Sequence, residues 1–480
     1  MTNRSLLPRI ARALGGRPCF LVGGYLRDLL LGRPSKDLDF VAPEPEQAAQ
    51  AVAAALGRPL VRLSERWARY RVPWRQLTLD FTALRGHTLE EDLRQRDFTI
   101  DALGAPLAEF AARGSEAIVD PCGGRADLER RVVRLAYPQA FRDDPVRLVR
   151  AFRLAGTLGF SLDPGLLDQV EALAPLLSGV AVERVRAELF GLLGAWGAAD
   201  LLAEMGRRGL VAHVLPELVP TFTQPQTHYH HLGVWEHLLE TIRQLDGLLA
   251  DTAWLGPCAA PLCRLLASAG AHGRTRLQLL RLACLVHDVG KPQTASQDEA
   301  GLLHFYRHPQ VGANLVRGLG ARLRLSRREI HDLAGVVALH LRPLQMLASG
   351  GAQGRAGGRL LAQAGELAPQ LLLLALADHL ASRGPATTDT ELAAHRQLTL
   401  DLLCRYFFPP VAPTPPPVNG NLLMARYQLP PGRLVGRLLA EIGQAHQEAP
   451  FASPAQVWEY VESHHPELAA RRKDGEDTDR

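Results

Sequence analysis

The spacing of apolar and polar residues divides the chain into a mixed first part and a helical remainder. Before about residue 125, short apolar runs typical of strands alternate with helical stretches such as Ala48–Leu56. From 128 to about 218, and again from 228 to about 406, apolar residues follow a helical period. The strands are expected at Cys19–Val22, Leu38–Val41, Leu60–Leu63, Tyr70–Val72 and Leu77–Thr82. The pattern predicts an α/β or α+β head followed by two all-helical parts.

Proline and glycine clusters mark the boundaries between these parts. Pro216, Pro220 and Pro225 separate the two helical parts. The run Pro409–Pro417 predicts an extended linker, after which a short helical tail follows. A glycine-rich loop is expected at Gly350–Gly358, inside the second helical part.

The composition is that of a folded protein with several domains. The chain has 480 residues, of which 47% are hydrophobic and 22% charged. Its longest apolar run, Leu371–Ala377, is too short to cross a bilayer, so no membrane contact is expected. Six cysteines are scattered without close pairs, which argues against a disulfide framework and favours a reducing cytoplasm.

Arginine supplies nearly all the positive charge behind the net charge of +4. Lysine occurs only at Lys36, Lys291 and Lys473. A GC-rich genome is the favoured explanation, and recognition of phosphate by guanidinium groups is compatible with it. Two of the three lysines, Lys36 and Lys291, lie inside the motifs described next.

The first candidate site lies between Gly23 and Phe40. Gly23 and Gly24 follow an expected strand and precede an expected helix, so the backbone there is able to approach phosphate oxygens. Asp37 and Asp39 stand at i and i+2 in the next strand, so both carboxylates lie on one face. Such a pair suits Mg²⁺, which binds carboxylates together with substrate phosphates. Taken alone, the pair is more typical of a solvated strand end.

These motifs together resemble the polymerase β-type nucleotidyltransferases, in the class II branch of bacterial CCA-adding enzymes and poly(A) polymerases. The run Arg96–Leu103 resembles the motif that contacts ribose and triphosphate, with Asp101 where Asn is usual. Asp120–Gly124 resembles the hinge that follows the head. The resemblance implies catalytic roles for Asp37, Asp39 and Asp80, with Asp37 and Asp39 as Mg²⁺ ligands. It implies nucleotide binding by Gly23, Gly24, Arg27, Asp28, Lys36, Arg96, Asp97 and Asp101.

The run Asp143-Asp144-Pro-Val-Arg147 resembles the family's amino-acid template, usually Glu-Asp-x-x-Arg, with Asp143 in place of Glu. Asp144 and Arg147 are expected to project from one helix face. A carboxylate accepts hydrogen bonds and a guanidinium donates them, so the pair matches C and A and rejects U and G. An ordinary salt-bridged helix face is the alternative. Arg150 is also expected to bind nucleotide, whereas Glu183, Arg184 and Glu188 are expected to support the neck.

The second candidate site begins with Leu285-Val-His287-Asp288 and resembles the HD phosphohydrolase superfamily. Inward-facing imidazoles and carboxylates on several helices form a transition-metal site. The implied ligands of one or two divalent metals are His237, His287, Asp288, His308, His340 and Asp378. The alternative is an HD domain that serves mainly as a scaffold for RNA. His228, His230 and His231 are expected to be surface or loop residues.

The resemblance covers nearly the whole chain and assigns a role to each part. The parts are a nucleotidyltransferase head at 1–127, a helical neck at 128–218, an HD domain at 226–406 and a linker with helical tail at 407–480. The expected fold class is therefore α+β, with a small mixed sheet in the head and an all-α neck and HD domain. In the tail, Asn421 stands where the family usually has Asp.

The connection after the third acidic strand bears on which nucleotides are added. Full CCA-adding relatives carry a flexible loop there, whereas Thr82–Arg85 and Thr88 are here joined by only Gly86 and His87. This shortening resembles enzymes that add only CC, which leave the final A to a separate A-adding enzyme.

The resemblance implies a cytoplasmic enzyme that extends the tRNA 3′ end from CTP and ATP. Three alternatives stay open. The same site would serve an A-adding enzyme or a poly(A) polymerase. The HD site would be the working centre of an RNA-binding phosphohydrolase in RNA repair. A nucleotide-sensing regulator would elongate no RNA.

Overall fold

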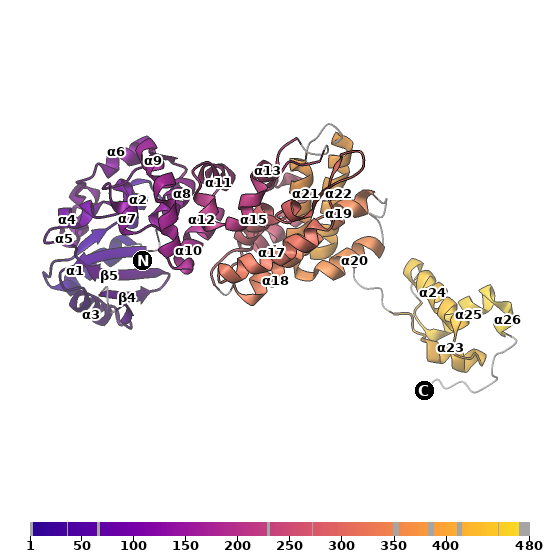
Figure 1. Ribbon diagram of the computed structural model, residues 1–480. Coiled ribbons are helices and arrows are strands. Elements are labelled where there is room, and N and C mark those ends of the chain that lie inside the picture. The colour runs from indigo at the N-terminus through magenta and orange to yellow at the C-terminus, as the bar shows by residue number, and fades with distance from the viewer. Residues whose placement is uncertain are drawn as a thin grey trace. The chain divides into compact units, whose positions relative to one another are not determined.

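A computed structural model describes residues 3–35, 37–64, 68–227, 231–270, 272–348, 355–382, 388–409, 415–449 and 451–469. The chain forms two compact units, Met1–Tyr406 and Phe407–Arg480. Lys36, His228 and His230 lie outside the described residues, as do parts of the expected glycine-rich loop and proline-rich linker. Figure 1 shows the sheet of the head in indigo, followed by helices coloured magenta to orange.

The head contains one mixed sheet, as expected. Its strands run in the order β3-β4-β5-β2-β1-β6, and only the β2–β5 pair is parallel. The five predicted strands are confirmed, and β6 is an edge strand that sequence patterning missed. The strands are β1 (Phe20–Val22), β2 (Asp37–Ala42), β3 (Val61–Ser64), β4 (Arg69–Trp74), β5 (Leu77–Ala83) and β6 (Gly104–Pro106).

Helices cover the apolar face of this sheet. α3 (Pro45–Leu56) packs against β4 and β5, and α1 (Asn3–Leu14) packs against α3 and α5 (Leu107–Arg113). Phe40 of β2 stacks on Phe81 of β5 with ring centroids 4.8 Å apart. Both rings are fully buried. Their contact therefore stabilises the parallel β2–β5 pair in addition to its backbone hydrogen bonds.

The neck consists of short helices that continue from the head. Its two longest helices, α8 and α10, pack against each other. Two residues each of β7 (Val132–Val133) and β8 (Ser161–Leu162) pair in parallel, a small departure from the all-helical expectation. The helices are α6 (Gly124–Arg130), α7 (Ala140–Asp143), α8 (Arg147–Leu158), α9 (Pro164–Leu173), α10 (Val182–Leu193), α11 (Ala198–Arg207) and α12 (Leu210–Val214).

The following helices form a bundle within the same compact unit. Between α16 (Lys291–Thr294) and α17, the hairpin β9 (Ala295–Gln297) and β10 (Leu303–Phe305) interrupts the expected run of helices. The larger helices are α13 (Val234–Ala250), α14 (Ala259–Ala267), α15 (Arg276–Val286), α17 (His308–Arg322), α18 (Arg327–Leu339), α20 (Arg355–Ala364), α21 (Ala368–Ala381) and α22 (Asp389–Phe407).

One stretch of this bundle, Ala356–Ala381, is long and apolar enough to cross a membrane. However, 72% of its most apolar window is buried inside the protein. The core helix of a soluble protein has the same properties, and every residue of α21 is buried.

Arg281 joins the neck to this bundle. Its guanidinium is 1% exposed, lies 2.7 Å from the Asp246 carboxylate of α13 and donates to the Leu193 carbonyl at the end of α10 (2.8 Å). Gln278, also on α15, donates to the Phe190 carbonyl (2.8 Å). Side chains of α15 therefore bind two carbonyls in the last turn of α10.

The second unit has a helical core of its own. Leu423, Tyr427, Leu438, Ile442 and Val457 are buried in it. They come from α23 (Gly420–Tyr427), α24 (Arg433–Glu448) and α25 (Pro454–His464), which α26 (Pro466–Ala469) follows.

The Arg274–Glu329 ion pair predicts how stability depends on pH. Burial raises the pKa of Glu329, but hydrogen bonds from Arg274 (2.6 and 2.8 Å) and Ser326 lower it to about 2 overall. Because the folded pKa lies below the unfolded one, the stabilisation is present above about pH 4.5 and is lost as pH falls toward 2. Glu329→Gln should cost about 1.5–3 kcal/mol of unfolding free energy at pH 7, measured by urea denaturation.

This cost should shrink as the pH is lowered from 5 to 3. Glu366→Gln is the matched control, because its ion pair with Arg328 is 64% exposed on both sides and should contribute little. An unfolding free energy that differs between Glu329→Gln and wild type by the same amount at all pH values would contradict the pKa argument.

Candidate functional site

Three carboxylates gather on the face of the head sheet opposite Phe40 and Phe81. Asp37 and Asp39 lie on β2, and Asp39 is in register with Asp80 on the parallel neighbour β5. Burial raises the pKa of Asp39 to about 6, and Asp80 and Asp37 add to the shift while Arg96 opposes it. Clustered carboxylates that are costly to ionise are a fitting place for a cation. The structure thus brings together the three residues that the sequence singled out.

Arginines surround Asp80. Arg71 makes a two-armed contact with its carboxylate (2.6 and 2.8 Å), and Arg69 lies 3.2 Å away. Thr78 donates a hydrogen bond to Asp37 across the β2–β5 pair. Asp80 is 5% exposed, and the charge of its carboxylate is compensated by Arg69 and Arg71. Asp37, by contrast, is exposed at the start of its strand.

The Gly23 turn faces this carboxylate cluster. Gly23 has a φ of 76°, and a Cβ there would lie 3.1 Å from Nη1 of Arg96 and 3.9 Å from Oδ2 of Asp39. A side chain at this position would be strained and would crowd the site. The turn leads into α2 (Gly24–Leu30), whose Arg27 and Asp28 pair with each other.

The second motif is connected to the first by ion pairs. Arg27 donates to Asp101 (2.7 Å), the position where the family has Asn. Arg96 pairs with Asp92 of α4 (Leu89–Arg94) at 2.9 Å. The departure at Asp101 therefore provides a charged partner for Arg27.

Asp97 is joined to the neck by Arg150. Arg150 donates to Asp97 (2.9 Å) and to Glu188 of α10 (2.7 Å), and Arg153 also binds Glu188. Burial raises the pKa of Asp97, but Arg150, together with Arg147 and Arg96, outweighs this and lowers the pKa overall. Arg150, expected to bind nucleotide, thus makes the same kind of supporting contact that was expected of Glu188.

The expected geometry of Asp144 and Arg147 is wrong in one respect. The two residues do not share a helix face, because α7 ends at Asp143 and α8 begins at Arg147. Asp144 is extended (φ −150°, ψ 95°), as a residue before proline tends to be. Asp144 pairs with Arg184 of α10 (2.6 Å), whereas Arg147 is buried and binds Tyr137 (2.9 Å).

The connection between β5 and α4 is a short capped turn. The Arg85 amide donates to Asp92 (3.0 Å), the His87 amide donates to Glu91 (2.6 Å), and Thr88 caps α4. Gly86 has a φ of 81° and lies against Glu91. The turn is thus held by hydrogen bonds to the first turn of the helix that it precedes.

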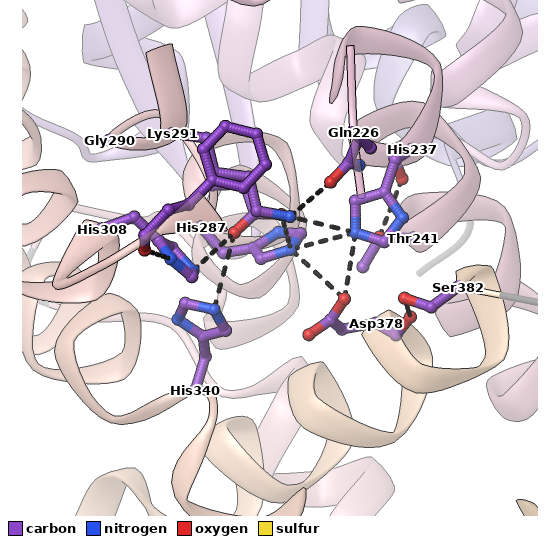
Figure 2. A network of polar contacts seen from close by, with 12 residues as sticks. Gln226, His237, Thr241, His287, Gly290, Lys291, His308, His340, Asp378 and Ser382 are labelled. Atoms are coloured by element: carbon purple, nitrogen blue, oxygen red, sulfur yellow. Dashed lines mark hydrogen bonds and ion pairs between the residues drawn. The ribbon is translucent and has the colours of Figure 1, made fainter. Parts of the chain in front are cut away.

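The six expected HD ligands converge at the centre of the second helical part, and Figure 2 shows most of them. Nε2 of His237 lies 3.3 Å from Nε2 of His287 and 3.0 Å from Oδ1 of Asp378. Asp288 lies 3.3 Å from His287 through Oδ2 and 3.1 and 3.6 Å from His308 and His340 through Oδ1. All six side chains are buried.

The histidines present their Nε2 atoms to this centre. Nδ1 of His287, His308 and His340 donates to the carbonyls of Cys284, Phe305 and Val337 (2.8–2.9 Å). A carbonyl only accepts, so Nδ1 carries the proton and Nε2 is left to bind a metal. Nε2 of His308, Nε2 of His340 and Oδ1 of Asp288 are buried without a hydrogen-bond partner. Acceptors gathered in this way fit a divalent cation.

The charge of the cluster points the same way. Burial lowers the pKa of His287, but Asp288 and Asp378 outweigh it and raise the pKa to about 10. Burial lowers the pKa of His340 to about 3. Lys291, 2.6 Å from Asp288, supplies one positive charge to the two carboxylates, and a proton on His287 or a bound cation would supply a second.

Sequence reasoning missed two polar residues of these sites. Gln226 accepts from Lys291 (2.5 Å), which in turn pairs with Asp288 (2.6 Å). Tyr137 contacts both Asp143 and Arg147. Neither carried a signal, since a lone Gln after a proline and a lone Tyr before one are common. His231 is exposed, as expected.

Family models match three segments of the chain. The model described as the poly A polymerase head domain matches residues 19–134, and the HD domain model matches residues 229–383. A model described as a probable RNA and SrmB-binding site of polymerase A matches residues 159–221.

Relatives align along nearly the whole chain. The A-adding tRNA nucleotidyltransferase of Deinococcus radiodurans is 34% identical over 448 residues, covering 92% of this chain and 94% of the relative. The CC-adding tRNA nucleotidyltransferase of Thermus thermophilus is 34% identical over 440 residues, covering 90% of each. The solved structure of the Thermotoga maritima CCA-adding enzyme complexed with tRNA shares the fold, with a TM-score of 0.59, 18% identity and coverage of 96% and 94%. The protein therefore belongs to the class II family of tRNA nucleotidyltransferases and poly(A) polymerases, and it carries an HD domain.

Proposed function

We propose that the protein is a template-independent tRNA nucleotidyltransferase that adds CC to the 3′ end, with a metal-dependent phosphohydrolase site in its HD domain. The observation that carries the transferase function is the cluster of Asp37, Asp39 and Asp80 opposite the Gly23 turn. Its substrates are the tRNA 3′ end and CTP, and a separate enzyme then supplies the final A.

In this proposal Asp37 and Asp39 hold Mg²⁺, and Asp80 completes the acidic cluster. The chemistry that such an ion supplies is activation of the attacking hydroxyl and neutralisation of the leaving pyrophosphate. Arg27, Arg96 and the backbone at Gly23 and Gly24 are proposed to position the triphosphate. Asp28, Lys36, Asp97, Asp101 and Arg150 are the further nucleotide-binding positions that we propose.

Base selection is assigned to Asp144 and Arg147. Although they lie on separate segments, both remain at the junction of α7 and α8, so one acceptor and one set of donors are available to a base. C and A offer the complementary pattern and U and G do not. Arg184, which holds Asp144, would release or share this carboxylate when a base binds, while Tyr137 would keep its contact with Arg147.

The short turn after β5 favours CC addition over complete CCA addition. Its backbone is fixed by Asp92 and Glu91, so it offers no flexible segment to reshape the base site between C and A. The Thermus thermophilus relative is named for CC addition and the Deinococcus radiodurans relative for A addition, at equal identity. A addition is therefore the second candidate.

The HD cluster is proposed to bind one or two divalent transition metals. His237, His287, Asp288 and Asp378 would hold the first ion, and His308 and His340 would join Asp288 around the second. The chemistry supplied there is phosphate binding and activation of water. We further propose the division into a head at 1–127, a neck at 128–218, an HD domain at 226–406 and a tail at 407–480, in a cytoplasmic protein.

A gel extension assay tests the nucleotide specificity. Transcripts of tRNA that lack CCA, CA or A are given CTP, ATP or both with Mg²⁺. Addition should stop after two C residues because the turn at Gly86 leaves the base site fixed. Completion to CCA would refute the argument from the turn, ATP-only extension would favour the A-adding alternative or polyadenylation, and no extension would refute transferase function.

Two substitutions separate the sites. Asp39→Ala should abolish extension, a loss of at least about a thousandfold, because it removes a ligand of the catalytic ion. Asp288→Ala should leave extension within about twofold and abolish hydrolysis of a generic phosphodiester such as bis-p-nitrophenyl phosphate. Loss of both activities in either variant, with folding intact by circular dichroism, would contradict independent sites.

Metal content tests the HD cluster directly. After loading with Mn²⁺ or Ni²⁺ and dialysis, the wild type should retain one or two equivalents by elemental analysis. His287→Ala should retain less, because it removes an Nε2 donor from the centre. His304→Ala is the matched control, since His304 lies outside the cluster and pairs with Asp298 instead (2.8 Å). Equal retention by both variants would overturn this metal assignment.

A further inference from the structure

Arg147 is held by few groups, although its guanidinium is buried. Arg147 is 8% exposed and is the first residue of α8. Its Nη1 donates to the Tyr137 hydroxyl (2.9 Å) and to the Ala140 carbonyl (3.0 Å), while its Nε is buried without a partner. Because an arginine side chain has many rotamers, its orientation depends strongly on these two contacts.

The Tyr137 hydroxyl is the middle of a three-membered chain. It donates to Oδ2 of Asp143 (2.6 Å) and accepts from Nη1 of Arg147 (2.9 Å). Burial raises the pKa of Tyr137, and Asp143 adds to the shift, so the phenol stays protonated and continues to donate at neutral pH. Hydrogen bonds linked in this way strengthen one another.

Asp143 reaches Arg147 only through this hydroxyl. Residues 68–227 are described without a gap, and within them Asp143 makes no direct ion pair with Arg147. The two lie at the end of α7 and the start of α8, separated by the break at Asp144 and Pro145. A carboxylate with one more methylene would extend about 1.5 Å further, roughly the length of a carbon–carbon bond.

We propose that Tyr137 is a positioning residue that relays the orienting contact of Asp143 to Arg147 and thereby sets the selectivity for the incoming base. The inference rests on the proposed function, in which Arg147 donates to the ring nitrogen of the base. Tyr137 holds the guanidinium in one orientation before the nucleotide arrives, so less ordering is required when C binds.

The test is steady-state kinetics of single-nucleotide addition to tRNA, with CTP and with UTP, for Tyr137→Phe, Asp143→Glu and the double variant. Tyr137→Phe should raise KM for CTP with kcat nearly unchanged. It should lower the CTP-to-UTP ratio of kcat/KM about tenfold, the effect of one lost hydrogen bond. Asp143→Glu in the Tyr137→Phe background should restore most of the ratio, because the longer carboxylate reaches Arg147 directly.

The rescue separates positioning from mere packing. A loss caused by weakened folding would not be restored by lengthening a neighbouring carboxylate. Tyr306→Phe, whose side chain is exposed and far along the chain in the HD part, is the matched control and should match the wild type. Unchanged selectivity in Tyr137→Phe, or a loss that the double variant does not reverse, would overturn the relay. A wild type that uses UTP as readily as CTP would overturn the proposed base reading and the relay with it.

Discussion

One guanidinium, that of Arg150, ties the second motif of the head to the neck. It lies between Asp97 and Glu188, so a carboxylate from each part shares the same cation. Removing Arg150 from this partly buried set would leave the Asp97 carboxylate without its ion pair. The groups proposed to hold the triphosphate are therefore fixed relative to those proposed to read the base. A shift of α8 would affect both sets of groups.

Ion pairs of this kind also bear on the arginine-rich composition of the chain. In the described part of the head, three arginines form ion pairs with carboxylates at or near the site: Arg27 with Asp101, Arg71 with Asp80 and Arg96 with Asp92. The expectation of a GC-rich genome would explain why arginine is used in place of lysine, but it would not explain where these side chains lie. Their two-armed geometry suits carboxylate and phosphate alike, so the same groups that stabilise the free site are suited to bind a nucleotide.

Much of the site could be predicted from sequence because it depends on residues that lie close together in the chain. The period of two in a strand places Asp37 and Asp39 on one face, and the order of the HD motifs predicted six residues whose side chains the structure brings together. The register of Asp80 with Asp39 depends on a parallel pairing of distant segments, which no local pattern specifies. The break before Pro145 was readable, since a residue preceding proline avoids the helical region, but the helical period of the surrounding apolar residues concealed it. Tyr137 had no signal because its role depends on where α7 and α8 meet.

Three of the four histidines of the HD cluster, His287, His308 and His340, have the position of their proton set by a backbone carbonyl. His287 and His340 each follow the last turn of a helix, and each bonds a carbonyl three residues back. A helix always leaves such carbonyls unbonded at its end, so the event that terminates the helix also selects the tautomer. No side chain performs this task, and a carbonyl cannot be removed by substitution. Substitutions in the surrounding sequence would therefore leave the orientation of His287 and His340 unchanged, provided that α15 and α18 continue to end at the same residues.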